Sequence, residues 1–127
     1  MKKILIVEDE PALLSALLEK FRQEGFAAIG AKDGQEGLDT ALREHPDLIL
    51  LDIIMPVMDG MTMLYELRKD NWGRNVPVIL LTNLSEAESV AESLSQGVYD
   101  YLVKSDWKLE DIVKKVREKL GVGSDVL

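Results

Sequence analysis

Five polar residues directly follow short apolar runs in this sequence, and their types could support chemistry. They are Glu8 and Asp9 after the run 4–7, Asp52 after 48–51, Thr82 after 76–81 and Lys104 after 99–103. Asp52 is the most unusual of them, because apolar residues stand on both sides of it and an unpaired buried carboxylate is costly. A functional role would explain why a charge is kept at this position.

The residue types indicate a metal-assisted phosphoryl transfer. Three carboxylates at contact distance, Glu8, Asp9 and Asp52, repel one another, so a cation must join them. Oxygen ligands suit Mg²⁺, with Mn²⁺ as an alternative, and Mg²⁺ commonly takes one or two carboxylates plus waters and phosphate oxygens. Lys104 adds a positive charge and Thr82 a hydroxyl donor for the oxygens of a phosphoryl group. Asp52 is then the candidate nucleophile, which would form an aspartyl-phosphate.

Two periods alternate along the chain and predict the elements that position these residues. The four apolar runs and a further one, Phe26–Ile29, predict five β-strands, with helix-period segments between and after them. Apolar residues recur at helical spacing at Leu13, Leu14, Leu17, Leu18 and Phe21, and again at Leu109, Ile112, Val113, Val116 and Leu120. This (βα)5 pattern predicts an α/β fold, a doubly wound five-stranded parallel sheet of flavodoxin-like type with helices on both faces.

Local signals mark the ends of several helices. Pro11 fits a first helical turn, and Ser85 with Glu88 forms a capping-box pattern that would open the fourth helix. Two segments, Asp59-Gly60 and Asn71–Asn75, are predicted turns or loops. Three glycines fit helix ends: Gly25, Gly97 and Gly121.

The expected strand order, 2-1-3-4-5, explains why polar residues follow the strands. In this order strands 1 and 3 are neighbours at the point where the winding of the sheet reverses, and open α/β sheets bind ligands outside the carboxyl ends of strands there. Asp9 and Asp52 are therefore expected to face each other across one crevice.

Composition excludes several classes of protein. The 127 residues, 46% of them hydrophobic, suffice for one domain with a full core. No apolar stretch approaches the roughly 18 residues of a membrane span, and the run after Lys3 is too short for a signal peptide. Cysteine is absent, which excludes a disulfide framework and thiolate metal sites. We therefore expect a cytoplasmic protein with no membrane association, and the net charge of −8 argues against direct nucleic-acid binding by this domain.

Four motifs in this order resemble the receiver domain of two-component response regulators. They are "IVEDEP" with the acidic pair Glu8-Asp9, "LLDIIMPVMDG" around Asp52, "VILLTN" ending after Thr82, and "YDYLVK" with Tyr101 and Lys104. The resemblance covers essentially the whole chain. It predicts a receiver domain over residues 1–121 and a flexible tail or the start of a linker over 122–127.

The resemblance implies a role for each site residue. A histidine kinase or histidine phosphotransfer protein would donate the phosphoryl group to Asp52. Mg²⁺ would be held by Asp9, Asp52, a water-bridged Glu8 and the backbone carbonyl of Ile54. Thr82 and Tyr101 would form a switch pair, and Thr82 with Lys104 would assist the transfer. The chain would be a signalling phosphoacceptor and not an enzyme acting on other substrates.

The output would pass through protein contacts. The surface of the fourth helix, fifth strand and fifth helix is expected to bind an unknown downstream protein. Because no DNA-binding or enzymatic domain follows residue 120, we expect either a stand-alone receiver or a receiver cut from a longer chain.

Departures from the family pattern concern access to the phosphoryl group. Ser105 stands where the family usually has proline after a cis bond, which leaves the conformation of the Lys104–Ser105 peptide open. Asn83 replaces a small residue, and Ile54 and Leu84 are apolar where they flank the path of an attacking water. These three residues are expected to narrow the path of water to the phosphoryl group and so to slow hydrolysis of the aspartyl-phosphate.

Other interpretations compete with this one. A haloacid-dehalogenase-type phosphatase also uses an aspartate nucleophile with Mg²⁺, but it needs a second aspartate where Ile54 stands. A nucleotide- or flavin-binding module would need glycines in the first turn, where this chain has "VEDEPA". Tyr101 could instead be a core residue. His45, the only histidine, is expected in a loop and not as a phosphodonor.

Overall fold

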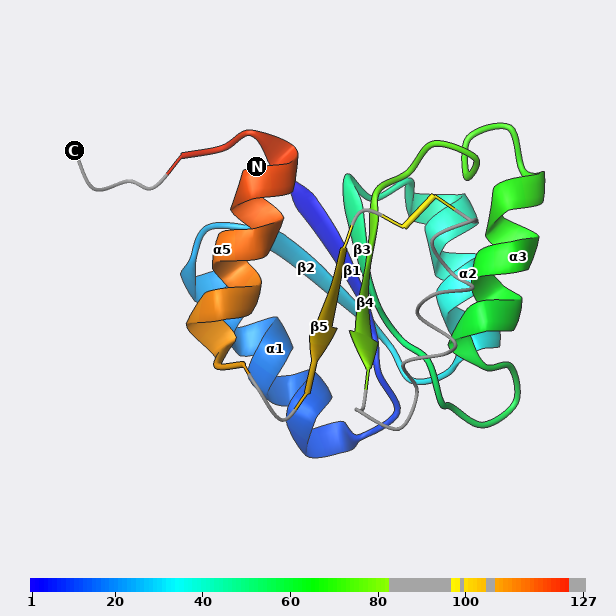
Figure 1. The fold of residues 1–127 in the computed structure, drawn as a ribbon, viewed down its shortest axis with the longest axis horizontal. Coiled ribbons are helices and arrows are strands. Elements are labelled where there is room, and N and C mark those ends of the chain that lie inside the picture. Colours follow the sequence, from blue (N-terminus) through cyan, green and yellow to red (C-terminus); the bar gives the residue numbers. More distant parts are fainter. Residues whose placement is uncertain (83–96, 99, 105–106, 124–127) are drawn as a thin grey trace.

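The computed structural model describes residues 1–82, 97–98, 100–104 and 107–123, which form one α/β layer structure (Figure 1). The elements in chain order are β1 (Lys3–Val7), α1 (Pro11–Gln23), β2 (Ala27–Ala31), α2 (Gly34–Glu44), β3 (Leu48–Asp52), α3 (Gly60–Lys69), β4 (Val78–Thr82), β5 (Asp100–Val103) and α5 (Leu109–Leu120).

The sheet has the predicted topology. All neighbouring strands are parallel, in the order β2-β1-β3-β4-β5, so the predicted strand order is confirmed. Val7, the last residue of β1, pairs with Ala31 of β2 on one side and with Leu51 of β3 on the other. The carboxyl ends of these strands therefore lie next to one another.

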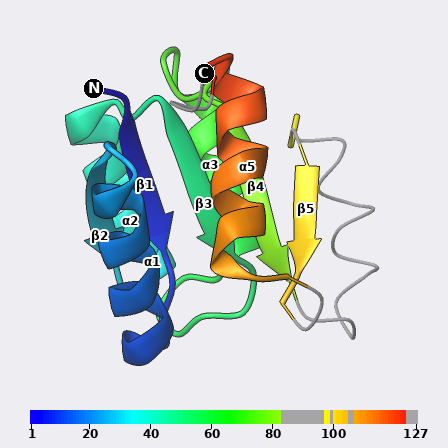
Figure 2. The same cartoon turned by 90° about the vertical axis from the view of Figure 1, so that its left-hand side faces the viewer.

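Helices cover both faces of the sheet. Figure 2 shows α1 and α5 in front of the sheet and α2 and α3 behind it. Every residue of β3 and of β4 is buried, as expected for central strands of a parallel sheet covered on both sides. A hydrophobic cluster lies on each face of the sheet. Because side chains alternate along a strand, Leu5 and Val7 belong to the cluster under α2 and α3, whereas Ile4 and Ile6 belong to the cluster under α1 and α5.

Helix ends follow the sequence signals in part. Pro11 begins α1, and Gly25 and Gly121 follow α1 and α5 with φ of +92° and +68°. The prediction of a turn or loop at Asp59-Gly60 holds for Asp59 only, because Gly60 is already the first residue of α3. Asp59 precedes the helix and its side chain accepts a hydrogen bond from the Thr62 N–H at 2.8 Å.

Two expected features lie outside the described residues, namely the capping box of Ser85 with Glu88 and Tyr99, the first residue of the predicted last strand. Val122 packs against the cluster under α1 and α5. Among the residues that the structure describes, no helix is long and apolar enough to cross a membrane.

The loop between β3 and α3 contains a strained turn. The Met58 N–H donates to the Pro56 carbonyl at 2.7 Å, which closes a three-residue turn around Val57. Val57 has φ of +67°, a conformation that is unusual for a β-branched residue, and its side chain is 82% exposed. Packing of the Val57 side chain therefore contributes little to offset the strain.

Replacing Val57 with asparagine should stabilise the protein. Asparagine tolerates a positive φ, so Val57→Asn should raise the free energy of unfolding by about 1 kcal/mol, the lower end of the cost of such a conformation. Urea denaturation measures the change. Val57→Thr is the matched control, since threonine is also β-branched and should leave the stability nearly unchanged. Equal stabilities of the two variants would show that Val57 is not strained.

Candidate functional site

The structure brings the three acidic residues of the sequence analysis together at one edge of the sheet. Glu8 and Asp9 follow β1 and Asp52 ends β3. One carboxylate oxygen from each lies within 4.8 Å of the other two. Glu8 and Asp52 are buried and Asp9 is exposed, so the cluster opens to solvent on the side of Asp9.

Lys104, the residue that follows β5, joins this cluster. Its Nζ lies 2.9 Å from Oε1 of Glu8 and 3.3 Å from Oδ1 of Asp52. The backbone N–H of Lys104 donates to the Thr82 carbonyl at 2.6 Å, which continues the pairing of β5 with β4. Burial alone would lower the pKa of Lys104, but the hydrogen bond from Lys104 to Glu8 and the charge of Asp52 raise it above its ordinary value. Lys104 is therefore charged at neutral pH.

Asp52 holds its proton more tightly than an ordinary aspartate. Burial and the neighbouring charge of Glu8 raise the pKa of Asp52 from 3.8 to about 7, although Lys104 acts in the opposite direction. The Asp52 residue is 3% exposed and Glu8 is fully buried. A further positive charge at the cluster would favour ionised Asp52, because an opposite charge nearby stabilises the charged form.

The remaining predicted site residues differ in exposure. Thr82 is buried at the end of β4, at the same edge of the sheet as Asp52. Tyr101 lies on β5 opposite Leu80 and is 44% exposed, so the alternative that it is a core residue is wrong. Ile54 is 59% exposed in the loop after β3. Three predicted positions lie outside the described residues: Asn83, Leu84 and Ser105.

Two backbone contacts at this site were missed by the sequence analysis. The Gly60 N–H donates to the Ile53 carbonyl at 2.7 Å, and a Cβ on Gly60 would lie 2.1 Å from the Asp52 carbonyl oxygen. Gly34 makes a similar contact with Met58. The repeated dipeptide Asp-Gly, at positions 33–34 and 59–60, is the only sequence signal that marks them.

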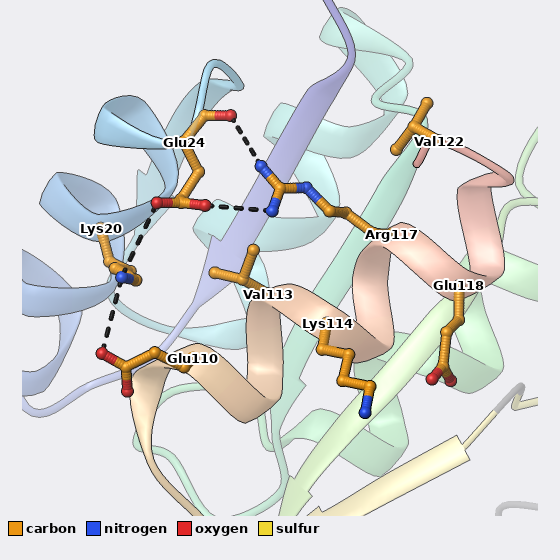
Figure 3. Close-up of a pocket in the computed structure, with 8 residues that line it drawn as sticks. All are labelled: Lys20, Glu24, Glu110, Val113, Lys114, Arg117, Glu118 and Val122. Atoms are coloured by element: carbon orange, nitrogen blue, oxygen red, sulfur yellow. Dashed lines mark hydrogen bonds and ion pairs between the residues drawn. The ribbon is translucent and has the colours of Figure 1, made fainter. Parts of the chain in front are cut away.

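A separate groove lies between α1 and α5 and contains none of the acidic cluster (Figure 3). Ion pairs connect the two helices there. Lys20 lies 3.6 Å from Glu110, and Arg117 lies 3.0 Å from Glu24 and also donates to the Glu24 carbonyl. These ion pairs connect α1 with α5, so the packing of the two helices explains this part of the groove.

Comparisons with known proteins agree on one family. A family model described as the response regulator receiver domain matches residues 4–117. The DNA-binding response regulator MtrA of Mycolicibacterium smegmatis is 37% identical over 98% of this chain and 53% of its own length. The chain spans about half the length of the curated relatives it matches.

Solved structures give the same result. A CheY-like response regulator receiver domain from Methanospirillum hungatei has a TM-score of 0.87 and 30% identity, covering 95% of this chain and 94% of that one. The receiver domain of a sensor histidine kinase from Pseudomonas aeruginosa, solved with a magnesium ion in its active site cleft, has a TM-score of 0.85 and 31% identity. It covers 94% of this chain and 98% of that one.

The raised pKa of Asp52 predicts a pH-dependent gain of stability in Asp52→Asn. Folded protein binds the Asp52 proton more tightly than unfolded protein, so this residue's contribution to stability is lost as the pH rises from about 4 to about 7. Without metal, Asp52→Asn should gain at least about 1 kcal/mol over wild type at pH 8, a few degrees in melting temperature. The gain should be smaller at pH 5. Melts of both proteins in EDTA at the two pH values measure it, and an equal gain at both would contradict the raised pKa.

Proposed function

The chain belongs to the response regulator receiver family, and from this premise we propose that it accepts a phosphoryl group on Asp52. The donor is the phosphohistidine of a histidine kinase or of a histidine phosphotransfer protein. One observation carries the proposal: a buried aspartate at the carboxyl end of β3 shares one cluster with Glu8, Asp9 and Lys104. This arrangement combines a nucleophile, a set of cation ligands and a fixed positive charge.

The donor set fits Mg²⁺, and Mn²⁺ takes the same ligands. In the part of the chain that the structure describes, the side chains of this acidic cluster offer carboxylate oxygens, the type of ligand that hard divalent ions prefer. Asp9 and Asp52 are proposed as direct ligands, together with the Ile54 carbonyl. Glu8 suits contact through a water, because its two oxygens already face the Lys104 ammonium and the Glu10 N–H. When bound, the ion supplies positive charge for the oxygens of the phosphoryl group.

The chain's own residues carry out the transfer. A carboxylate oxygen of Asp52 attacks the phosphorus atom, a P–O bond forms, and the P–N bond to the donor histidine breaks. Lys104, which already lies 3.3 Å from Asp52, balances negative charge on the phosphoryl oxygens, and the Thr82 hydroxyl donates a hydrogen bond to one of them. Water later breaks the new P–O bond, so the domain promotes only its own phosphorylation and dephosphorylation.

Phosphorylation is proposed to change a protein-binding surface. Thr82 moves toward the phosphoryl group and Tyr101, which is exposed in the present structure, turns inward from the surface of β5. The affected surface includes β5 and α5 and binds the downstream partner. Curated relatives are named as DNA-binding regulators, so a DNA-binding output is the proposed class of response. The exposed Ile54 side chain offers no polar group to orient a water, which favours a long-lived phosphorylated state.

Asp52→Asn should abolish phosphorylation. Wild type incubated with acetyl phosphate and MgCl₂ should gain one phosphoryl group by intact-mass measurement, whereas Asp52→Asn should gain none. Asp47→Asn is the control, because Asp47 precedes β3 at its opposite end and should leave the gain unchanged. If Asp52→Asn gained the mass of one phosphoryl group as wild type does, Asp52 would not be the acceptor. Sustained hydrolysis of phosphomonoesters by wild type would instead support the alternative function, a phosphatase of haloacid-dehalogenase type.

Asp9→Ala should weaken Mg²⁺ binding more than Glu8→Ala. A direct carboxylate ligand contributes more than one that acts through water, so we expect losses of about a hundredfold and about tenfold in affinity. Titration with MgCl₂, followed by amide NMR signals, measures both. Glu10→Ala is the control, since Glu10 is exposed and its backbone contact with Glu8 remains. Equal affinities of the Asp9 and Glu8 variants would refute these roles.

A further inference from the structure

The loop 53–59 follows the proposed phosphoacceptor Asp52 and contains Ile54, whose carbonyl is a further proposed Mg²⁺ ligand. It also contains the turn closed by the Met58 N–H and the Pro56 carbonyl, with Val57 at φ of +67°. A strained conformation persists only where the surrounding structure holds it. The contacts that hold this loop therefore decide where the Ile54 carbonyl lies.

Gly34 provides one of these contacts from the start of α2. Its N–H donates to the Met58 carbonyl at 2.9 Å. A residue in the first turn of a helix has no hydrogen-bond partner for its N–H within that helix, so the Met58 carbonyl satisfies this donor. The bond joins the amino end of α2 to the loop that follows the phosphoacceptor strand.

The distance between the two backbones requires glycine at position 34. A Cβ on Gly34 would lie 2.1 Å from the Met58 carbonyl oxygen and 2.8 Å from the Met58 carbonyl carbon. Because both are backbone atoms, no change of rotamer can make room. Even alanine at this position must push α2 and the loop apart.

Gly60 fixes the other end of the same loop. It donates to the Ile53 carbonyl at 2.7 Å and approaches the Asp52 carbonyl so closely that a Cβ would lie 2.1 Å away. The loop is thus held at residues 53 and 58, and Ile54 lies between these points. The outer side of the turn borders a hollow that Val57 lines together with residues of β2 and α2. If the loop lost its contact with Gly34, it could move into this hollow.

We propose that Gly34 is a positioning residue of the phosphorylation site, whose close contact with Met58 holds the Ile54 carbonyl where Mg²⁺ binds. This inference rests on the proposed function. It assigns a role in metal binding to a residue of α2 that contributes no ligand and lies outside the acidic cluster.

Gly34→Ala tests the role through the dependence on Mg²⁺. Residues that orient metal ligands typically change metal affinity by about 10–100-fold, and we expect about a tenfold weaker Mg²⁺ affinity by calorimetric titration. The MgCl₂ concentration that gives half-maximal phosphorylation by acetyl phosphate should rise by the same factor. The rate at saturating MgCl₂ should change little, because the nucleophile and Lys104 remain.

Gly37→Ala is the matched control in the same helix. The three atoms nearest to a Cβ on Gly37 would be side-chain atoms of Met63 and Val7 at 2.9 Å, and none of them belongs to the loop. This variant should lose stability through packing but keep the Mg²⁺ dependence of wild type. A wild-type Mg²⁺ dependence in Gly34→Ala would overturn the proposal, as would an equal loss of affinity in both variants.

A measurement on wild type covers the case in which Gly34→Ala does not fold. If the Gly34–Met58 contact strengthens Mg²⁺ binding, then bound Mg²⁺ must strengthen the contact by the same factor. Amide hydrogen exchange of Gly34 should therefore slow by about tenfold in saturating MgCl₂, in line with the expected change in affinity. If wild type binds Mg²⁺ but the amide hydrogen exchange of Gly34 does not change, the role of Gly34 is overturned and the proposed function is not. Wild type that binds no Mg²⁺ overturns the proposed function with it.

Discussion

The contact of one lysine with two buried carboxylates is the interaction on which this site depends. Glu8 and Asp52 are almost completely buried, and two like charges at short distance repel strongly where water is excluded. Lys104 lies within 3.3 Å of both carboxylates and offsets part of this repulsion. The compensation is incomplete, since the pKa of Asp52 is still raised to about 7. A further cation beside Asp52 would offset more of this repulsion.

The parallel sheet makes this cluster possible by bringing distant segments to one edge. Val7 and Leu51 pair directly, so the residues that follow them lie side by side, and the pairing of Thr82 with Val103 brings Lys104 to the same edge. Helices on both faces bury the central strands and exclude water behind the carboxylates. The cost of the buried charges is met by the large apolar clusters on either side of the sheet.

Close backbone contacts set the geometry around Asp52. Gly34 and Gly60 each approach a carbonyl so closely that a side chain is excluded, and between them they fix the loop that contains the strained Val57. The groove between α1 and α5 is different, since ion pairs between long side chains hold it and such pairs adapt easily. Close backbone contacts thus occur in the loop that follows Asp52, and adaptable side-chain contacts occur where α1 packs against α5.

The sequence by itself determined the elements, their order and the chemical types at the site, because hydrophobic periodicity is local and the carboxyl ends of parallel strands meet at one edge. It could not determine the exposure of Tyr101, since alternation in a short edge strand does not say which face is covered. The dipeptide Asp59-Gly60 predicts a turn or loop, but Gly60 begins α3 and Asp59 caps it, because the same dipeptide suits both structures. Only the tertiary structure decided that Lys104 contacts Glu8 as well as Asp52 and that Gly34 holds Met58. Such contacts join segments far apart in the chain, and their distances depend on how whole elements pack.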